Sequence, residues 1–375
     1  MKVYNETWLK NAAIQQQAEN WNRQSWLTDE TLAQIKKVFP DESYQPIIWI
    51  KCGLFIFTSI AFSFGSGFFA LFGLNAPEIY ALVNAIAAVL GLEILIKDKK
   101  LRHSGADNAL LYIALGAVFG FLFMLFESLN NAIFWGMLPV LAIAVYRYAD
   151  RLVALALFAN VLWLLSTYLF ESTVGKMLAS FVFMAFAAGV YALVRGKSER
   201  FRFLYWADCL WICEVSALVV LYLSGNYAVV RAGSEALLGS KGEIQFAPLF
   251  WGFTFLIPVV YVYFGLRKKD RKLLIIGILA MVGAVITFRT YYAIVPVEIA
   301  LSVGGALMIL VAILLIRYLQ TERHGLSDAP DATMPKWIEA QSIVLSQITQ
   351  QTLQQAPDLK FGDGDFGGGG AGEKY

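Results

Sequence analysis

The chain has 375 residues, of which 58% are hydrophobic and only 15% are charged. A soluble domain is about 45–50% apolar and about 25% charged, so this composition excludes an ordinary soluble protein and indicates a membrane protein. The formal net charge of +2 gives no reason to expect a nucleic-acid partner, and three cysteines with two histidines are too few for a disulfide framework or a His-rich metal centre. We therefore expect no cofactor or metal.

Residues 1–46 are polar and are predicted to form a cytoplasmic tail of two short helices. Apolar residues recur at helical spacing from Trp8 to Ala13. A second helix is predicted to begin after Thr28, which is a capping residue followed by two acids, and to end at Pro40. This tail either binds a cytoplasmic protein partner or packs against the inner face of the membrane domain.

Residues 47–319 are predicted to form an all-α, polytopic transmembrane helical bundle, because apolar runs of roughly 20 residues follow one another closely. The glycines between residues 64 and 74 leave open whether the first span continues or breaks there. Between the seventh and eighth spans, the glycine-containing stretch 233–242 is expected to be an exposed loop, or else a lid. We place ten spans at about 47–70, 76–96, 108–126, 132–149, 151–170, 174–194, 205–224, 248–266, 273–289 and 293–318.

Positive charge alternates from one connecting segment to the next. Twenty-five of the 30 lysines and arginines fall on one side of the ten-span arrangement, and four fall on the other. Because loops rich in lysine and arginine stay in the cytoplasm, this partition predicts that both termini are cytoplasmic.

Residues 320–375 are predicted to form a second cytoplasmic tail. It begins with a polar linker and continues with one amphipathic helix from Lys336 to Gln355. The glycine-rich end has too little apolar surface to fold alone, so we expect it to be disordered.

Two stretches of the chain resemble known bacterial proteins. The first is Trp26-Leu27-Thr28-Asp29-Glu30-Thr31-Leu32, followed at once by many short apolar spans; this arrangement resembles the bacterial "predicted membrane protein" families of unknown function. The second is Asp365-Phe366-Gly367-Gly368-Gly369-Gly370-Ala371-Gly372, which is similar to the glycine-rich tails of bacterial TPM-domain membrane proteins, although this chain has no soluble domain of that kind. The resemblance implies the cytoplasmic (inner) membrane of a bacterium and assigns no role to any residue.

Glu214 is the first candidate site residue, because it falls near the middle of the predicted seventh span. Asp208 lies six residues earlier in the same span. Hydrocarbon disfavours the ionised form of a carboxyl unless a cation or a hydrogen-bond donor offsets it, and such groups mark ion or proton pathways in many transporters. The competing interpretation is a neutral Glu214 hydrogen-bonded to a neighbouring helix.

Arg289 and Glu298 form the second candidate. Arg289 ends the predicted ninth span and Glu298 begins the tenth, both on the outer side. The two charges are expected to pair across the short turn, either as a clasp between the helices or as an anion-binding group in an outer vestibule.

The sequence leaves three functions open. The first is a non-enzymatic integral membrane protein whose cytoplasmic tails bind a protein partner. The second is a secondary transporter that uses Glu214, with five spans in each of two inverted halves. The third is an enzyme acting on lipid or cell-wall precursors, with Glu214 and Asp208 as acid and base, although no catalytic motif is present. The sequence does not indicate an oligomeric state.

Overall fold

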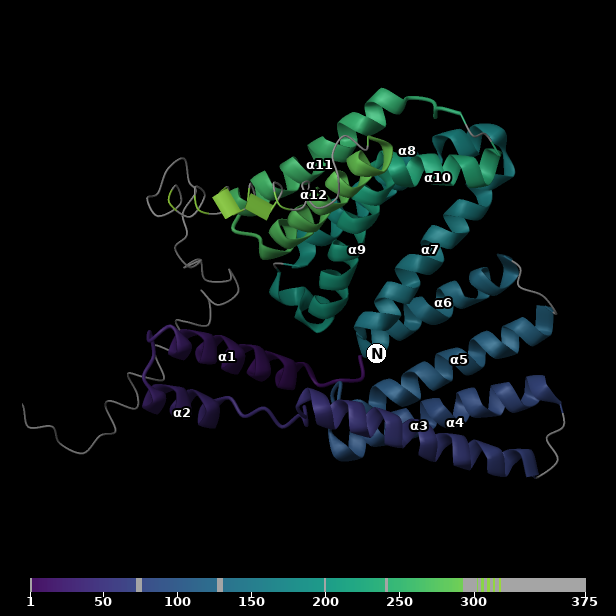
Figure 1. Ribbon diagram of the computed structural model, residues 1–375. Helices are drawn as coiled ribbons and strands as arrows, with labels where there is room; N and C mark the ends of the chain where they lie inside the picture. The colour runs from purple at the N-terminus through teal and green to yellow at the C-terminus, as the bar shows by residue number, and fades with distance from the viewer. Residues whose placement is uncertain are drawn as a thin grey trace, which may run out of the picture.

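The computed structural model of the protein describes residues 2–71, 76–126, 131–198, 200–239 and 242–292, and a few separate positions between 302 and 317. Within these residues the fold is all-helical, with twelve α-helices, one 3₁₀ helix and no strands (Figure 1). Nine of these helices are long and apolar enough to cross a membrane, so the protein is a polytopic integral membrane protein. The nine are α3 (Ile48–Leu71), α4 (Pro77–Lys99), α5 (Ala106–Phe126), α6 (Asn131–Tyr148), α7 (Arg151–Glu171), α8 (Thr173–Ser198), α9 (Ala207–Gly225), α11 (Ala247–Arg267) and α12 (Arg271–Tyr291).

The first nine predicted spans are confirmed, with their ends shifted by a few residues. The first span does not break at Gly65 or Gly67, because α3 runs without interruption to Leu71. Residues 72–74 lie outside the described residues. The tenth predicted span, 293–318, and the C-terminal tail lie almost wholly outside the described residues.

Four helical hairpins make up most of the bundle. α4 packs against α5, α6 against α7, α8 against α9, and α11 against α12. Ion pairs join the hairpins at their turns: Arg147 contacts Glu93 near the end of α4 at 2.7 Å, Arg151 contacts Asp208 at 2.7 Å, and Arg195 contacts Asp270 at 2.9 Å. The four turns therefore lie at one end of the bundle, which we call the basic end; it comprises residues 97–106, 147–151, 195–207 and 267–272.

The hairpin turns share a local design. Asp150 and Asp270 are the N-caps of α7 and α12, and each accepts hydrogen bonds from backbone amides of the first turn that follows. The residue before each cap, Ala149 or Lys269, has a positive φ of 49° or 51°, which turns the chain sharply between the two helices. Aspartates also occupy the first turns of α5 and α9, at Asp107 and Asp208.

Figure 1 shows the helices in two groups. α3 to α7 lie side by side in one fan, and α8, α9, α11 and α12 form a second group. α7 joins the groups, because it packs on both α8 and α9. A short 3₁₀ helix, η1 (Phe201–Trp206), leads into α9.

The N-terminal tail forms the two predicted helices, α1 (Glu6–Arg23) and α2 (Asp29–Val38). Thr28 caps α2 as predicted, since its side chain accepts a hydrogen bond from the backbone N–H of Thr31. Ile14, Ala18 and Ile35 fill the small core between the helices. The hairpin stands away from the membrane helices in Figure 1, and α2 packs against α1.

Both ends of this tail are anchored at the basic end of the bundle. The backbone N–H of Val3 donates to the carbonyl of Arg147 at 3.2 Å. At the other end, Tyr44 pairs with Leu101 in an isolated β-bridge. The tail therefore packs against the membrane domain at these two points. This was one of the two interpretations of the tail, the other being that it binds a cytoplasmic protein partner.

The segment between α9 and α11 contains a helix, α10 (Tyr227–Leu238), where a plain loop or lid was expected over residues 233–242. The side chain of Asn226 caps its first turn by accepting from the backbone N–H of Ala228 at 3.0 Å. Gly239 ends it with a φ of 66°, a conformation that glycine adopts without strain. The expectation of a loop was wrong because it treated the glycines as breakers and overlooked these two caps.

Candidate functional site: a charged cavity at the basic end

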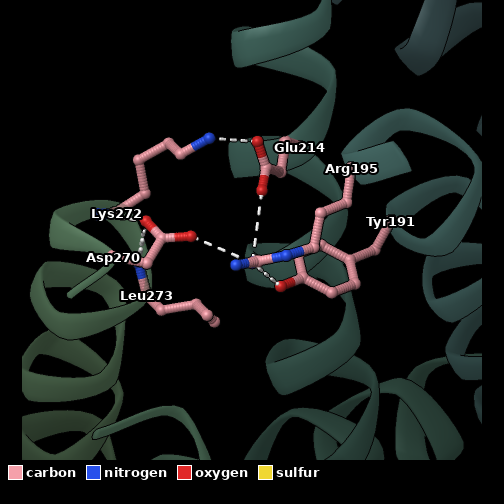
Figure 2. A network of polar contacts seen from close by, with 6 residues as sticks. All are labelled: Tyr191, Arg195, Glu214, Asp270, Lys272 and Leu273. Carbon is pink, nitrogen blue, oxygen red and sulfur yellow. Dashed lines mark hydrogen bonds and ion pairs between the residues drawn. The ribbon is translucent and has the colours of Figure 1, made fainter. Parts of the chain in front are cut away.

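Glu214 lies near the middle of α9, and its side chain is only 1% exposed. Lys272, from the first turn of α12, donates a hydrogen bond to Oε2 of Glu214 (Figure 2). The guanidinium of Arg195, near the end of α8, lies 3.6 Å from Oε1. A carboxylate in an apolar span is costly unless it is paired, and here three helices supply the acid and two cations.

Asp270 connects this pair to the turn before α12. Its Oδ2 accepts a hydrogen bond from Arg195 at 2.9 Å, while Oδ1 caps the helix through the backbone N–H of Lys272 at 3.0 Å. Arg195 also donates to the hydroxyl of Tyr191, one turn earlier on α8. Figure 2 shows Arg195 at the centre, between Glu214 on one side and Asp270 on the other.

A cavity of about 420 Å³ opens beside this network. The side chains that face it differ in exposure: Lys272 is 25% and Arg195 is 20% exposed, whereas Glu214 is 1% and Asp270 is 11% exposed. A solute entering the cavity therefore meets Lys272 and Arg195 before Glu214 and Asp270, whereas Asp208 is 44% exposed beside Arg151. The charged residues of the lining are Arg151, Arg195, Asp208, Glu214, Asp270 and Lys272, and Trp211 adds an aromatic ring.

The structure brings two of the four predicted site residues to this cavity. Asp208 and Glu214 both line it, but Asp208 pairs with Arg151, which is itself 59% exposed. Arg289 lies in the last turn of α12, about 26 Å along the helix axis from Lys272 at 1.5 Å per residue. It belongs to the opposite end of the bundle, and its expected partner Glu298 lies outside the described residues.

The ion pairs of Asp208 and Glu214 bear on the hypothesis that these two residues are the acid and base of an enzyme. An acid–base pair needs two carboxyl groups of different protonation that both reach a substrate. Here each carboxylate contacts a cation, and Glu214 lies behind Lys272 and Arg195. Among the described residues, no group of three or more His, Cys, Asp and Glu is placed to hold a metal ion.

A second polar cluster, which the sequence did not reveal, anchors the start of the chain. The hydroxyl of Tyr4 donates to Asp107 at 3.0 Å, and Asp107 also accepts from the backbone N–H groups of His103 and Ser104. Burial, and then the charge of Asp107, raise the pKa of the Tyr4 phenol well above its usual value. Burial lowers the pKa of His103.

A third polar cluster forms around Asp150. Besides capping α7, it accepts hydrogen bonds from Asn108 at 2.6 Å and from the hydroxyl of Tyr112 at 3.0 Å. It therefore ties the start of α7 to the first two turns of α5, and its 3% exposure is explained by these partners. A pattern in the sequence points to such residues, because the dipeptide Ala-Asp recurs at 106–107, 149–150 and 207–208.

Comparison of the chain with protein-family models, with curated proteins and with solved structures gives no match. Any functional assignment therefore depends on the geometry of the chain itself.

Proposed function

We propose that the protein is a secondary transporter for a small oxyanion, which it binds in the charged cavity. The observation that carries this proposal is the position of Glu214: a buried carboxylate in the middle of a membrane helix, covered by two cations that face a cavity. The lysine and arginine partition supports placing the basic end, and hence the mouth of the cavity, on the cytoplasmic side.

The exposed surface of the cavity supports an anionic solute. Lys272 and Arg195 present an ammonium and a guanidinium, which suit carboxylate and phosphate oxygens. Arg151 adds a third cation at the mouth, partly offset by Asp208. A cationic solute would meet Asp208 but would have to pass Lys272 and Arg195 to reach Glu214 and Asp270.

Glu214 supplies a reason for coupling to protons. An oxyanion that contacts Lys272 and Arg195 displaces the carboxylate of Glu214 from them. The displaced carboxylate would then be unpaired in an apolar span, which is unfavourable, so it takes up a proton. One solute oxyanion and one proton are thus bound together, and both are released when Glu214 recovers its partners.

Ligand binding to the purified protein tests the proposal. The probes are inorganic phosphate, succinate and glutamate as potassium salts, and the measurement is the thermal unfolding midpoint at constant ionic strength. At least one probe should raise the midpoint of the wild type in a saturable way. The increase should disappear in Lys272→Gln and persist in Lys268→Gln, which removes the same charge from the adjoining turn but does not line the cavity.

Glu214→Gln distinguishes a binding site from a purely structural ion pair. The neutral amide mimics the protonated acid, so Lys272 and Arg195 become available to the solute and the affinity for the probe should rise. Uptake into liposomes should at the same time lose its dependence on a proton gradient. A wild type that none of the three probes stabilises, or equal loss in Lys272→Gln and Lys268→Gln, would contradict the proposal.

A scaffold function is the second candidate, favoured by the exposed N-terminal hairpin. α2 packs against α1, and Trp26 before it is 53% exposed. Such a surface suits a cytoplasmic protein partner. A photoreactive residue at Lys37 should then form a discrete adduct with another protein in intact cells, whereas adducts only with this chain or with lipid would count against a scaffold.

A further inference from the structure

A groove of about 540 Å³ is lined by residues of α5, α6 and α7. These three helices are neighbours in the fan of Figure 1. Its lining is apolar and aromatic, and the rings of Phe134 and Trp163 stack with their centroids 4.9 Å apart. Gly116, Ala156 and Ala159 line the groove with small side chains or none, which leaves space beside these rings. The volume lies within the range of about 300–1,000 Å³ typical of small-molecule sites.

Asn160 is the polar side chain that this groove leaves without a partner. It is 7% exposed, and its Oδ1 makes no hydrogen bond within the described part of the chain. The hydroxyl of Tyr112, which lines the same groove, is already donated to Asp150. Burying an amide oxygen without a donor is unfavourable, so its presence in an apolar wall calls for a donor from outside.

The depth of Asn160 restricts what that donor can be. It is the tenth residue of α7, about 14 Å from Arg151 along the axis, which is close to the middle of a hydrocarbon core roughly 30 Å thick. The polar groups of phospholipids remain at the membrane surface. A hydroxyl at this depth therefore belongs to a molecule that is dissolved in the hydrocarbon itself.

We propose that the groove binds a flat, ring-bearing amphiphile of the isoprenoid quinol class. A ring hydroxyl donates to Oδ1 of Asn160, the ring packs against Phe134 and Trp163, and the chain follows the apolar wall along α5 and α7. Phe119 closes the lining on the α5 side. This site shares no lining residue with the charged cavity, so either proposal can fail without the other.

Titration of decylubiquinol into full-length protein tests this inference. The protein is held in phospholipid nanodiscs under anaerobic conditions, and binding is followed by thermal unfolding and by tryptophan fluorescence. The dimethyl ether of decylubiquinol, which keeps the ring, its methyl and methoxy groups and the decyl chain but has no hydroxyl, is the matched probe. Decylubiquinol should bind the wild type at least tenfold more tightly than its dimethyl ether.

Two pairs of variants locate the site. Asn160→Leu should weaken decylubiquinol binding about tenfold, whereas Asn84→Leu, the same change at another buried asparagine outside the groove lining, should leave it unchanged. Gly116→Phe fills the groove and keeps Asn160; a Cβ at Gly116 meets no atom within 4 Å, so the helix accepts it. Gly252→Phe, at an equally open glycine of α11, is its control.

Three results would overturn the inference. Equal binding of decylubiquinol by Asn160→Leu and Asn84→Leu would mean that the ligand makes no hydrogen bond to Asn160. Equal affinity for the dimethyl ether would mean that the groove holds the ring and chain without recognising a hydroxyl donor. A disulfide-linked dimer formed through Leu152→Cys at the groove, in a background without native cysteines, would mean that a second copy of the chain covers it.

Discussion

The pairing of Glu214 with Lys272 predicts strongly non-additive effects on stability. Lys272→Met leaves the carboxylate 1% exposed, with only the guanidinium of Arg195 at 3.6 Å. Removing one partner of a buried ion pair typically costs 3–5 kcal/mol, and because Arg195 remains we expect about 3 kcal/mol. Glu214→Leu removes the buried charge, and the remaining cations can turn toward the cavity, so its cost should be about 1 kcal/mol.

The double variant Glu214→Leu/Lys272→Met should be little worse than Glu214→Leu alone, because it leaves no unpaired buried charge. The expected coupling free energy is therefore about 2–3 kcal/mol. Reversible unfolding in mixed detergent micelles measures all four proteins. The exposed pair of Arg151 and Asp208 is a control cycle in which the coupling should stay below about 1 kcal/mol. Additive effects at Glu214 and Lys272, within about 0.5 kcal/mol, would refute the reasoning.

Three further predictions concern the N-terminal tail and the turn between α4 and α5 on which it packs. Gly105→Ala should cost about 3 kcal/mol or more in unfolding free energy, because φ at Gly105 is +100° and a Cβ there would lie 2.1 Å from the carbonyl oxygen of Lys51. Thr28→Ala should cost about 1 kcal/mol through the lost cap of α2, with Thr28→Ser close to wild type, as measured by hydrogen exchange in the tail. Burial lowers the pKa of His103 below 6.5, so as the pH falls the unfolded chain binds a proton at this residue before the folded chain does. The contribution of His103 to stability should therefore be complete above about pH 6.5 and should decrease as the pH drops below it. The melting temperature should depend less on pH in His103→Gln, and an unchanged pH profile would exclude His103 as the cause of the dependence.

The spans could be predicted because each depends on a single local property, the length of an apolar run, and a 30 Å core allows little variation in that length. The N-cap at Thr28 and the proline at position 40 that follows the end of α2 are equally local signals. The partners of Glu214 could not be found in this way, because Lys272 lies 58 positions away. Which face of one helix meets which turn of another depends on the packing of the whole bundle.

Some of what was missed nevertheless had a local signal. Asn226 and Gly239 bracket α10 as a cap and a C-terminal glycine, a pattern that predicts a helix between them. The repeated Ala-Asp dipeptides that precede or begin the second helix of three hairpins mark the turns at the basic end. Asn160 had no such signal, since an asparagine in an apolar span becomes noteworthy only when its partners are known.

The central claim is that the charged cavity opens to the cytoplasm and ends at Glu214. Measuring from which side of the membrane water reaches α9 tests this claim most directly. Single cysteines at positions 208, 211, 214 and 217 are placed in a chain without Cys52, Cys209 and Cys213, and a membrane-impermeant maleimide is added from either side. Positions 208, 211 and 214 should react only from the cytoplasmic side, and the fully buried Ala217 should react from neither. An unreactive position 214, or labelling from the outer side, would contradict a cytoplasm-facing cavity that ends at Glu214.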